Sequence, residues 1–564
     1  MTLVFLSLFS ELLPNDSRAR TALQVLGETL RAAAQRHQPE QLSPPVNAES
    51  DLARCTAMVD GLRDPAAYPH PVDRVELVET HISWVLLAGD YAYKLKKPVN
   101  LGFLDFSTLA RRRLFCREEV RINRRLAPTL YLGVIAVRGS VEQPRLGAAG
   151  PVLDYAVQMR RFPQSALLTN RQLDAATIDR IAERVARFHG EIPSTPEDSP
   201  CGTPEAVLAP MLQNFDHILS AVRDSNTRNS VVRLRQWTRE RFDVLRPRLS
   251  QRRRDGFVRE CHGDMHRGNI ALEDGEPIIF DGIEFSPALR WIDTMSELAF
   301  LVMDLREIGK EGLARRLLNR YMEITGDYEG LALLRFYQVY RAMVRAKVIA
   351  IRMQQPGADR LQDCAELHRY LELAKRTTTP LRPRMFITHG LSGSGKTELG
   401  HRLREHLPLI QLRSDIERKR MFHLPLEIQT AAAPNTGIYS IDATRRTYAR
   451  LLTLAGAVLA SGYSVMLDAT FLLRHQRDAA RALADHLGCS FTILALDAPL
   501  TVLRERIRVR LTRGTDASEA RPDILEAQLA RREPLGPDEH VRCVHLDTER
   551  GLSTDGLMRR LGLD

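Results

Sequence analysis

Apolar runs separated by turn residues mark the first structured region of the chain. From His81 an apolar run, His-Ile-Ser-Trp-Val-Leu-Leu-Ala, is followed by Gly89-Asp90 and then by the alternating run Tyr-Ala-Tyr-Lys-Leu-Lys-Lys-Pro. This pattern predicts a β-hairpin. The sequence further predicts a helix over 107–126, strands over 131–137 and 153–159, and mostly helices from 164 to 375. A strand–turn–strand segment around 257–285 interrupts those helices.

The hydrophobic pattern differs at the start of the chain and again after residue 375. Residues 1–60 are polar and contain Pro39, Pro44 and Pro45, so we expect a weakly structured extension. Residues 376–383 hold two prolines and three threonines without periodicity, which is typical of a linker. From Met385 strands and helices alternate to the end, which indicates a parallel α/β sheet. The sequence therefore predicts two unlike domains, 61–375 and 384–564.

Composition limits the class of protein. The 564 residues are 44% hydrophobic and 27% charged, as in ordinary globular proteins, and no apolar run reaches the roughly 18 residues of a membrane span. We therefore expect no membrane association. Seven dispersed cysteines suit a reducing cytoplasm better than a disulfide framework.

The basic residues are mostly arginine. Of 80 Lys and Arg residues only 8 are Lys, although the net charge is +10. Because lysine supplies a compact point charge, a lysine in this arginine-rich chain indicates a position where such a charge is needed.

The first candidate site is Cys-His262-Gly-Asp264-Met-His-Arg-Gly-Asn269. Asp264 and Asn269 have the spacing of a kinase catalytic loop, in which the Asp accepts the proton of the acceptor hydroxyl and the Asn binds Mg²⁺. The Asp274-Gly275 step predicts a hairpin that brings Asn269 beside Asp281. Two oxygen ligands there suit Mg²⁺.

The cation for the phosphates of this site is expected from the N-terminal sheet. Lys94 and Lys96 fall on one face of the predicted strand, and Glu119 on the following helix is the candidate partner that orients the lysine. Spacing leaves the choice between Lys94 and Lys96 open, with Lys94 favoured.

These residues resemble the aminoglycoside phosphotransferase-like kinases. The resemblance covers about 70–375 and rests on His262-Gly-Asp264, Asn269 and Asp281, with Tyr-Lys94-Leu-Lys-Lys-Pro and Val-Gln158-Met-Arg-Arg-Phe-Pro as further support. It implies an α+β, two-lobed protein-kinase-like fold, with a small lobe over about 70–163 and a large lobe over 164–375. It also implies ATP-dependent phosphorylation of a small-molecule hydroxyl, without fixing the substrate.

The second candidate site is a complete phosphate-binding loop, Gly390-Leu-Ser-Gly393-Ser-Gly395-Lys396-Thr397, between a predicted strand and a predicted helix. Its backbone N–H groups are expected to bind phosphates at the helix N-terminus. Lys396 reaches the β- and γ-phosphates in such loops, and the Thr397 hydroxyl binds Mg²⁺.

Further charged residues are expected around this loop. Asp468 ends an apolar run, the position of a carboxylate that supports Mg²⁺. Asp415 follows another apolar run and is the candidate acceptor-side base, with Arg418 one helical turn on to stabilise charge. Arg506 and Arg510 lie four residues apart on a predicted helix and are candidate ligands of the triphosphate.

Residues 384–564 resemble small P-loop kinases, among them polynucleotide 5′-kinases, zeta-toxin-like kinases and gluconate-type kinases. The leading hypothesis is a cytoplasmic, bifunctional phosphotransferase that uses ATP and Mg²⁺ on a small-molecule or nucleotide-type acceptor. Two alternatives remain: a kinase acting on nucleic-acid 5′ ends, and a non-enzymatic binding or regulatory protein gated by ATP.

Overall fold

The computed structural model describes residues 48–562, except for 102–103, 356–358, 427, 429, 431–435, 514–517, 519–520 and 550–553. Most of the predicted extension, residues 1–47, lies outside the described residues. The prediction was wrong for its last part, because Ala48–Gly61 form helix α2. Cys55, Met58 and Val59 of this helix are buried against the neighbouring sheet. Such packing stabilises a short helix that its own sequence does not predict.

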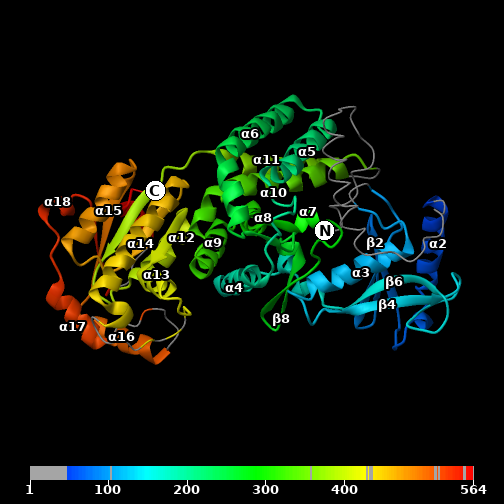
Figure 1. Ribbon diagram of the computed structural model, residues 1–564, viewed down its shortest axis with the longest axis horizontal. Coiled ribbons are helices and arrows are strands. Elements are labelled where there is room, and N and C mark those ends of the chain that lie inside the picture. The colour runs from blue at the N-terminus through cyan, green and yellow to red at the C-terminus, as the bar shows by residue number, and fades with distance from the viewer. Residues whose placement is uncertain are drawn as a thin grey trace.

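The small lobe is a six-stranded antiparallel sheet beside helix α3 (Figure 1). In the order in which the strands pair, it consists of β1 (Val75–Glu79), β2 (Ser83–Ala88), β3 (Tyr91–Lys96), β6 (Val152–Arg160), β4 (Tyr131–Gly139) and β5 (Pro144–Leu146). The predicted hairpin is β2–β3, with Gly89 at a positive φ of 56° in its turn. Helix α3 (Leu109–Asn123) begins where the Thr108 side chain accepts a hydrogen bond from the Arg111 N–H.

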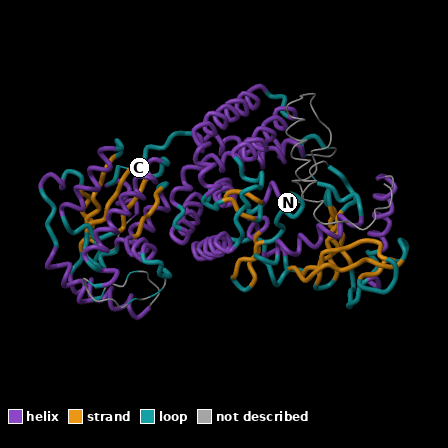
Figure 2. Tube along the Cα trace, in the orientation of Figure 1, coloured by secondary structure: helices purple, strands orange, loops and turns teal. Residues whose placement is uncertain are grey.

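The large lobe is mostly helical, as predicted (Figure 2). It contains α4 (Ala175–Glu191), α5 (Pro204–Ala221), α6 (Ser225–Arg254), α7 (Pro287–Arg290), α8 (Thr294–Glu307), α9 (Glu311–Thr325), α10 (Leu331–Arg352) and α11 (Arg360–Thr378). Two short pairs of strands interrupt the helices: β7 (Val258–Glu260) with β10 (Trp291–Asp293), and β8 (Ile270–Glu273) with β9 (Glu276–Ile279). The lobe is therefore a helical framework with one short strand pair and one short hairpin inserted between its helices.

The C-terminal domain is a parallel five-stranded sheet covered by helices. In spatial order the strands are β12 (Leu409–Arg413), β13 (Ser464–Asp468), β11 (Arg384–His389), β14 (Ser490–Asp497) and β15 (Cys543–Asp547). The helices are α12 (Lys396–His406), α13 (Ser414–Met421), α14 (Ile441–Ala460), α15 (Arg474–His486), α16 (Leu500–Arg513), α17 (Pro522–Arg531), α18 (Pro537–His540) and α19 (Thr554–Arg560). All five residues of β13 are buried, as expected for a strand inside a parallel sheet.

The connection between the two domains is shorter than the predicted linker. Helix α11 continues to Thr378, so the first three residues of the predicted 376–383 linker are helical. The buried Thr377 hydroxyl bonds to the Leu373 carbonyl and accepts a hydrogen bond from Arg306. After the short remaining connection, α9 of the large lobe packs against α12 and β12 of the C-terminal domain (Figure 1).

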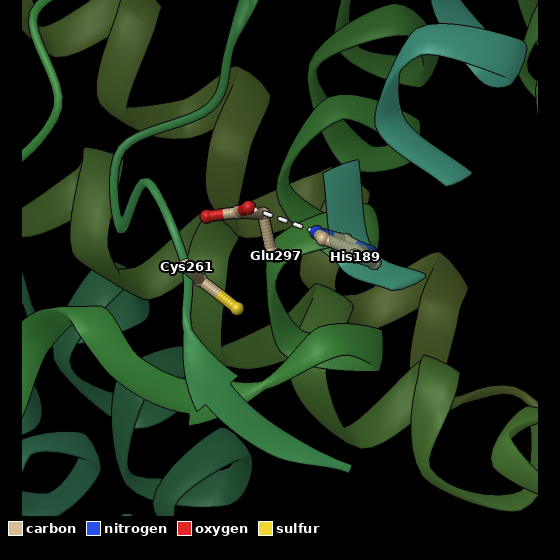
Figure 3. A group of neighbouring side chains, drawn as sticks. All are labelled: His189, Cys261 and Glu297. Atoms are coloured by element: carbon tan, nitrogen blue, oxygen red, sulfur yellow. Dashed lines mark hydrogen bonds and ion pairs between the residues drawn. The ribbon is translucent and has the colours of Figure 1, made fainter. Parts of the chain in front are cut away.

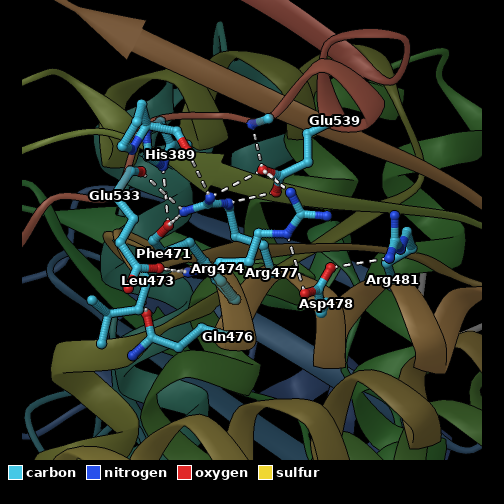
Figure 4. A network of polar contacts seen from close by, with 12 residues as sticks. His389, Phe471, Leu473, Arg474, Gln476, Arg477, Asp478, Arg481, Glu533 and Glu539 are labelled. Carbon is cyan, nitrogen blue, oxygen red and sulfur yellow. Dashed lines mark hydrogen bonds and ion pairs between the residues drawn. The ribbon is translucent and has the colours of Figure 1, made fainter.

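A buried arginine links two distant segments of the C-terminal domain (Figure 4). The Arg477 side chain is 1% exposed and pairs with Glu539 at 2.6 Å. It also donates to the carbonyls of Phe471 and Leu472, which follow β13. Arg477 thereby ties the segment before β15 to the loop at the carboxyl end of β13.

No helix among the described residues combines the length and the apolar character that a membrane crossing requires.

Candidate active sites

The His-Gly-Asp loop of the first domain follows β7, and its shape depends on the backbone conformation of Gly263 and on hydrogen bonds of His262. Gly263 has a φ of 88°, and a Cβ there would lie 2.8 Å from the Leu289 carbonyl oxygen, so this position requires glycine. His262 Nε2 lies 2.9 Å from the Phe280 carbonyl oxygen, and the Asp264 N–H lies 3.3 Å from His262 Nδ1. Burial lowers the pKa of His262, which favours the neutral ring that both contacts require. His262 is therefore a support for the loop.

Asp264 is buried, yet one of its oxygens is unused. Oδ1 has no hydrogen-bond partner in the described part of the chain, whereas Asn269 Nδ2 lies 3.3 Å from Oδ2. Burial opposes ionisation of Asp264, but the neighbouring His266 and His262 outweigh it, and its pKa lies below the ordinary value. Oδ1 is thus a buried acceptor atom of an ionised carboxylate that lacks a hydrogen-bond donor among the described residues.

The hairpin predicted at Asp274-Gly275 is confirmed. Strands β8 and β9 pair from Ile270 with Ile279, and the Phe280 N–H donates to the Asn269 carbonyl at 2.9 Å. This places Asn269 and Asp281 at the same end of the hairpin. Asp281 has a φ of 63°, a left-handed conformation that is uncommon for residues other than glycine and often occurs at functional sites.

Both candidate lysines are buried, and their contacts distinguish them. Lys94 Nζ lies 2.8 Å from Glu119 Oε1 and 2.8 Å from Asp281 Oδ1. Lys96 Nζ lies 2.7 Å from Glu119 Oε2 and also pairs with Glu284. Burial opposes the charge of Glu119, but Lys94 and Lys96 outweigh it and lower the pKa of Glu119 to about 2. Of the two lysines, only Lys94 contacts Asp281, the predicted metal ligand. This contact favours Lys94 as the lysine that would bind the phosphates.

A buried polar chain, missed by the sequence analysis, anchors the same loop (Figure 3). Glu297 accepts a hydrogen bond from the Gly263 N–H at 2.7 Å and lies 2.9 Å from His189 Nε2. His189 Nδ1 in turn lies 2.8 Å from the Tyr321 hydroxyl. Cys261 is close enough for the three side chains to have the proximity of metal ligands. Because hydrogen bonds already use both His189 nitrogens and both Glu297 oxygens, we assign the group to holding the loop.

The phosphate-binding loop of the second domain connects β11 to α12, as predicted. Gly393 and Gly395 have φ values of 84° and 87°, and a Cβ on Gly393 would lie 2.9 Å from the Leu503 carbonyl oxygen. Lys396 Nζ donates to the carbonyls of Gly390 at 3.2 Å and Leu391 at 2.7 Å. Burial lowers the pKa of Lys396 to about 8, opposed by the nearby carboxylates of Asp468 and Asp415.

Asp468 lies beside this loop at the end of β13, where the sequence predicts it. The Thr397 hydroxyl donates to Asp468 Oδ2 at 2.8 Å, and Gln411 Nε2 donates to the same oxygen at 2.9 Å. No described residue donates to Oδ1, and Asp468 lines the adjoining cavity. Thr397 and Asp468 therefore place oxygen atoms side by side at the phosphate-binding loop.

A cavity of about 410 Å³ brings the predicted residues of this domain together. Those in its wall are Gly393, Gly395, Lys396, Thr397, Asp415, Arg418, Asp468, Arg506 and Arg510. Gly390, the first residue of the loop, does not line the cavity. Arg413 and Arg531 also line it and were missed, because charged residues on helices and strand ends are most often solvated.

The arginines in the wall of the cavity have defined positions. Arg418, on α13 with Asp415, donates to the Ile438 carbonyl at 2.7 Å and to Thr444 Oγ1 at 3.2 Å. Arg506, on α16, donates to the Thr548 carbonyl at 2.7 Å and to the Gly393 carbonyl at 3.4 Å. Arg506 thus contacts the phosphate-binding loop itself.

Comparison with known proteins matches both domains. The "Phosphotransferase enzyme family" matches residues 103–334, and a family described as "AAA domain" matches residues 385–535. The uncharacterized proteins Rv2004c of Mycobacterium tuberculosis and Mb2027c of Mycobacterium bovis are each 30% identical over 487 residues, which cover 83% of this chain and 95% of the relative. This chain belongs to the same family as these mycobacterial proteins.

Solved structures similar to this family member each cover part of the chain. The amicoumacin kinase hAmiN, in complex with AMP-PNP, Ca²⁺ and Ami, is 14% identical and covers 59% of this chain and 96% of its own, with a TM-score of 0.38. A gluconokinase from Sinorhizobium meliloti 1021 is 23% identical and covers 32% of this chain and 93% of its own, with a TM-score of 0.23. By its matched family models, the chain carries a phosphotransferase domain followed by a domain of the AAA type.

Proposed function

We propose that the chain is a bifunctional, ATP-dependent phosphotransferase, in which each domain transfers the γ-phosphoryl group of ATP to a hydroxyl of its own acceptor. The observation that carries this proposal is that each domain holds a separate set of groups for this chemistry. The first set is the Lys94–Glu119 pair with Asp264, Asn269 and Asp281. The second is Lys396, Thr397 and Asp468 around a cavity that also contains Asp415 and Arg418.

In the first site, Asp264 orients the acceptor hydroxyl and accepts its proton through Oδ1. The side chain is held by the Asn269 amide, and its loop is held by the Glu297 contact to the Gly263 N–H. Lys94, kept charged by Glu119 and Asp281, binds the phosphates. A positioned base of this kind contributes about 10²–10⁴-fold to the rate.

The ligands in both sites fit Mg²⁺, a hard cation that prefers oxygen. Asn269 and Asp281 would hold it in the first site, and Thr397 and Asp468 in the second. The observation that supports this fit is that the Thr397 hydroxyl and the Asp468 carboxylate lie 2.8 Å apart in the wall of the cavity. When bound, the ion neutralises charge on the β- and γ-phosphate oxygens.

In the second site, the loop N–H groups and Lys396 bind the phosphates at the start of α12. Asp415, in the first turn of α13, lines the same cavity and accepts the proton of the acceptor hydroxyl, while Arg418 stabilises the charge that develops during transfer. Arg506 and Arg510 face the cavity from α16 and contact the triphosphate.

The acceptor of the second domain is small or nucleotide-like. The cavity of about 410 Å³ lies within the range of small-molecule sites, and several arginines line it. Those arginines also favour a second candidate, the 5′-hydroxyl of a nucleic acid. Oligonucleotide binding that weakens steeply with salt would favour the second candidate. The seven free cysteines fit a reaction in the reducing cytoplasm, where ATP is supplied.

The test is an acceptor screen with labelled ATP on the full chain and on Asp264→Asn and Lys396→Ala. We expect one class of acceptor to be lost in Asp264→Asn alone and another in Lys396→Ala alone. Loss of every acceptor in a single variant would show one active site and contradict the bifunctional proposal.

A further inference from the structure

The edge strand of the C-terminal sheet is paired to a side chain of the other domain. Strand β12 lies at the end of the sheet next to α9. Asn319 on α9 is buried, donates from Nδ2 to the Leu409 carbonyl at 2.8 Å and accepts the Gln411 N–H through Oδ1 at 2.9 Å. Nδ2 also donates to the Arg315 carbonyl of its own helix at 2.9 Å. The Asn319 amide thus takes the place of a neighbouring strand and ties β12 to α9.

The residue of β12 that Asn319 holds by its backbone reaches the P-loop site with its side chain. Gln411 Nε2 donates to Asp468 Oδ2 at 2.9 Å and to the Thr397 carbonyl at 3.3 Å. Asp468 Oδ2 is the same oxygen that accepts the Thr397 hydroxyl at 2.8 Å. One amide nitrogen therefore contacts both residues that fit Mg²⁺ in this site.

Packing alone does not account for a glutamine at position 411. Its side chain is buried, yet Oε1 has no hydrogen-bond partner among the described residues. A buried amide oxygen without a partner costs free energy that an apolar side chain of similar size would avoid. The two contacts made by Nε2 are the compensation that the structure offers.

The Gln411 amide is also held closely against the helix that follows the phosphate-binding loop. A Cβ added to Gly400 of α12 would lie 2.4 Å from both Cδ and Nε2 of Gln411. Because Gly400 has no side chain, α12 approaches β12 closely enough to enclose the amide. The position of Nε2 is therefore determined by β12 on one side and by α12 on the other.

We propose that Gln411 is a positioning residue of the P-loop site and that Asn319 of the first domain acts on the site through it. Asn319 fixes the edge strand at Gln411, and the Gln411 amide orients the Asp468 carboxylate beside Thr397 for the metal ion of a nucleotide. Hydrogen bonds from neighbouring groups commonly orient metal-binding carboxylates in this way. The first domain thereby contributes to nucleotide binding in the second.

This inference rests on the proposed function, because it requires that the P-loop site bind a nucleotide with Mg²⁺. The experiment therefore measures binding and not transfer. An ATP analogue is titrated into the full chain with Mg²⁺ and again with EDTA, and the binding event that Lys396→Ala removes is assigned to the P-loop site. Absence of that event in the wild-type chain would contradict the proposed function itself.

The first variant is Gln411→Met, which keeps the approximate size of the side chain and removes its donor. We expect it to weaken P-loop binding in Mg²⁺ by roughly 10–100-fold, the range for residues that orient metal ligands. Binding in EDTA should keep its wild-type affinity, because the loop N–H groups and Lys396 are unchanged. The matched control is Gln338→Met, a buried glutamine of α10 that accepts a hydrogen bond from Arg306 at 2.8 Å. It should leave both affinities unchanged.

The second variant, Asn319→Ala, tests the contact between the domains. It should weaken binding in Mg²⁺ by a smaller factor than Gln411→Met, because the Gln411 side chain remains. Combined with Gln411→Met it should add nothing to the loss, since two residues that act through one contact are not additive. Glu183→Gln is the control for α9, because Glu183 pairs with Arg320 of that helix at 2.7 Å on the side of the first domain. It should bind as the wild-type chain does.

Three outcomes would overturn the proposal. Wild-type affinity of Gln411→Met in Mg²⁺ would show that Gln411 does not act on the metal ligands. Equal weakening of this variant in Mg²⁺ and in EDTA would show a merely structural role. Wild-type affinity of Asn319→Ala, or an additive loss in the double variant, would show that Asn319 does not act through Gln411.

Discussion

Some residues of the first site can be predicted from their spacing in the sequence, whereas others come close to the site only in the folded chain. Asp264 and Asn269 are close in sequence, and the turn between β8 and β9 brings Asp281 to them. Glu284 pairs with Lys96 across 188 residues, and Glu297 bonds to Gly263 across 34. No local pattern connects such partners, because only the tertiary fold brings them together.

The first prediction concerns Asp264→Asn. The substitution keeps the size of the side chain and removes the proton acceptor, so transfer by the first domain should fall by about 10²–10⁴-fold. Nucleotide affinity should stay unchanged, because Asp264 contacts the acceptor. Single-turnover transfer and nucleotide titration measure the two quantities.

A matched control for this variant is Asp274→Asn, in the exposed turn of the same hairpin at a φ of 51° that Asn tolerates. It should transfer phosphate at the wild-type rate. Wild-type transfer in Asp264→Asn would show that another group accepts the proton.

The second prediction concerns Asp415→Ala. Removing the acceptor-side carboxylate should abolish transfer by the P-loop domain and spare the affinity for Mg²⁺-ATP, since Lys396, Thr397 and Asp468 remain. Asp442→Ala, an exposed carboxylate at the start of α14, should change neither quantity. If the domain only hydrolyses ATP or binds it, hydrolysis and affinity in Asp415→Ala will both equal those of the wild-type chain.

Whole elements were predicted well where a pattern is local and less well where tertiary packing decides. The β2–β3 hairpin, the catalytic hairpin and the strand before the phosphate-binding loop each have a local turn or glycine signal. Helix α2 and the last turn of α11 lack one. They are stabilised by burial of residues such as Met58 and Thr377 against elements that are distant in sequence.

The third prediction concerns Arg477 on α15, which links the segment before β15 to the loop that follows β13. Arg477→Ala leaves the buried Glu539 carboxylate without its main partner, a change that typically costs about 3–5 kcal/mol. The midpoint of urea unfolding of the C-terminal domain should fall accordingly. Arg481 lies on the same helix as Arg477. Arg481→Ala, which removes exposed contacts to Asp478 and to Asp538 of α18, should cost less than about 1 kcal/mol. Equal effects of the two variants would contradict this account of Arg477.

At the scale of the whole molecule, the sequence predicted two domains but not their contact. The proline- and threonine-containing segment before β11 indicates a boundary, and a boundary does not report whether the joined domains pack together. The packing depends on α9, whose Asn319 and Glu323 face the second domain while Tyr321 contacts the His189 ring of the first. A helical pattern alone does not assign these residues to partners in two different domains.

The fourth prediction is that each chain binds two nucleotides. Because the two phosphate sites lie in separate folds, Lys396→Ala should remove one binding event from an equilibrium titration and leave the other with its wild-type affinity. Lys375→Ala, an exposed lysine on α11, is the control and should keep both. A wild-type stoichiometry of one would refute the independence of the sites.

The Asn319 amide beside β12 has a consequence for synthesis of the protein. The ribosome completes α9, which ends at Thr325, well before β12, which begins at Leu409. Domains generally fold from the N-terminus as the chain emerges. The outermost strand of the second sheet therefore meets a hydrogen-bonding partner that is already in place, at the moment when an unpaired edge is most prone to pair with another chain.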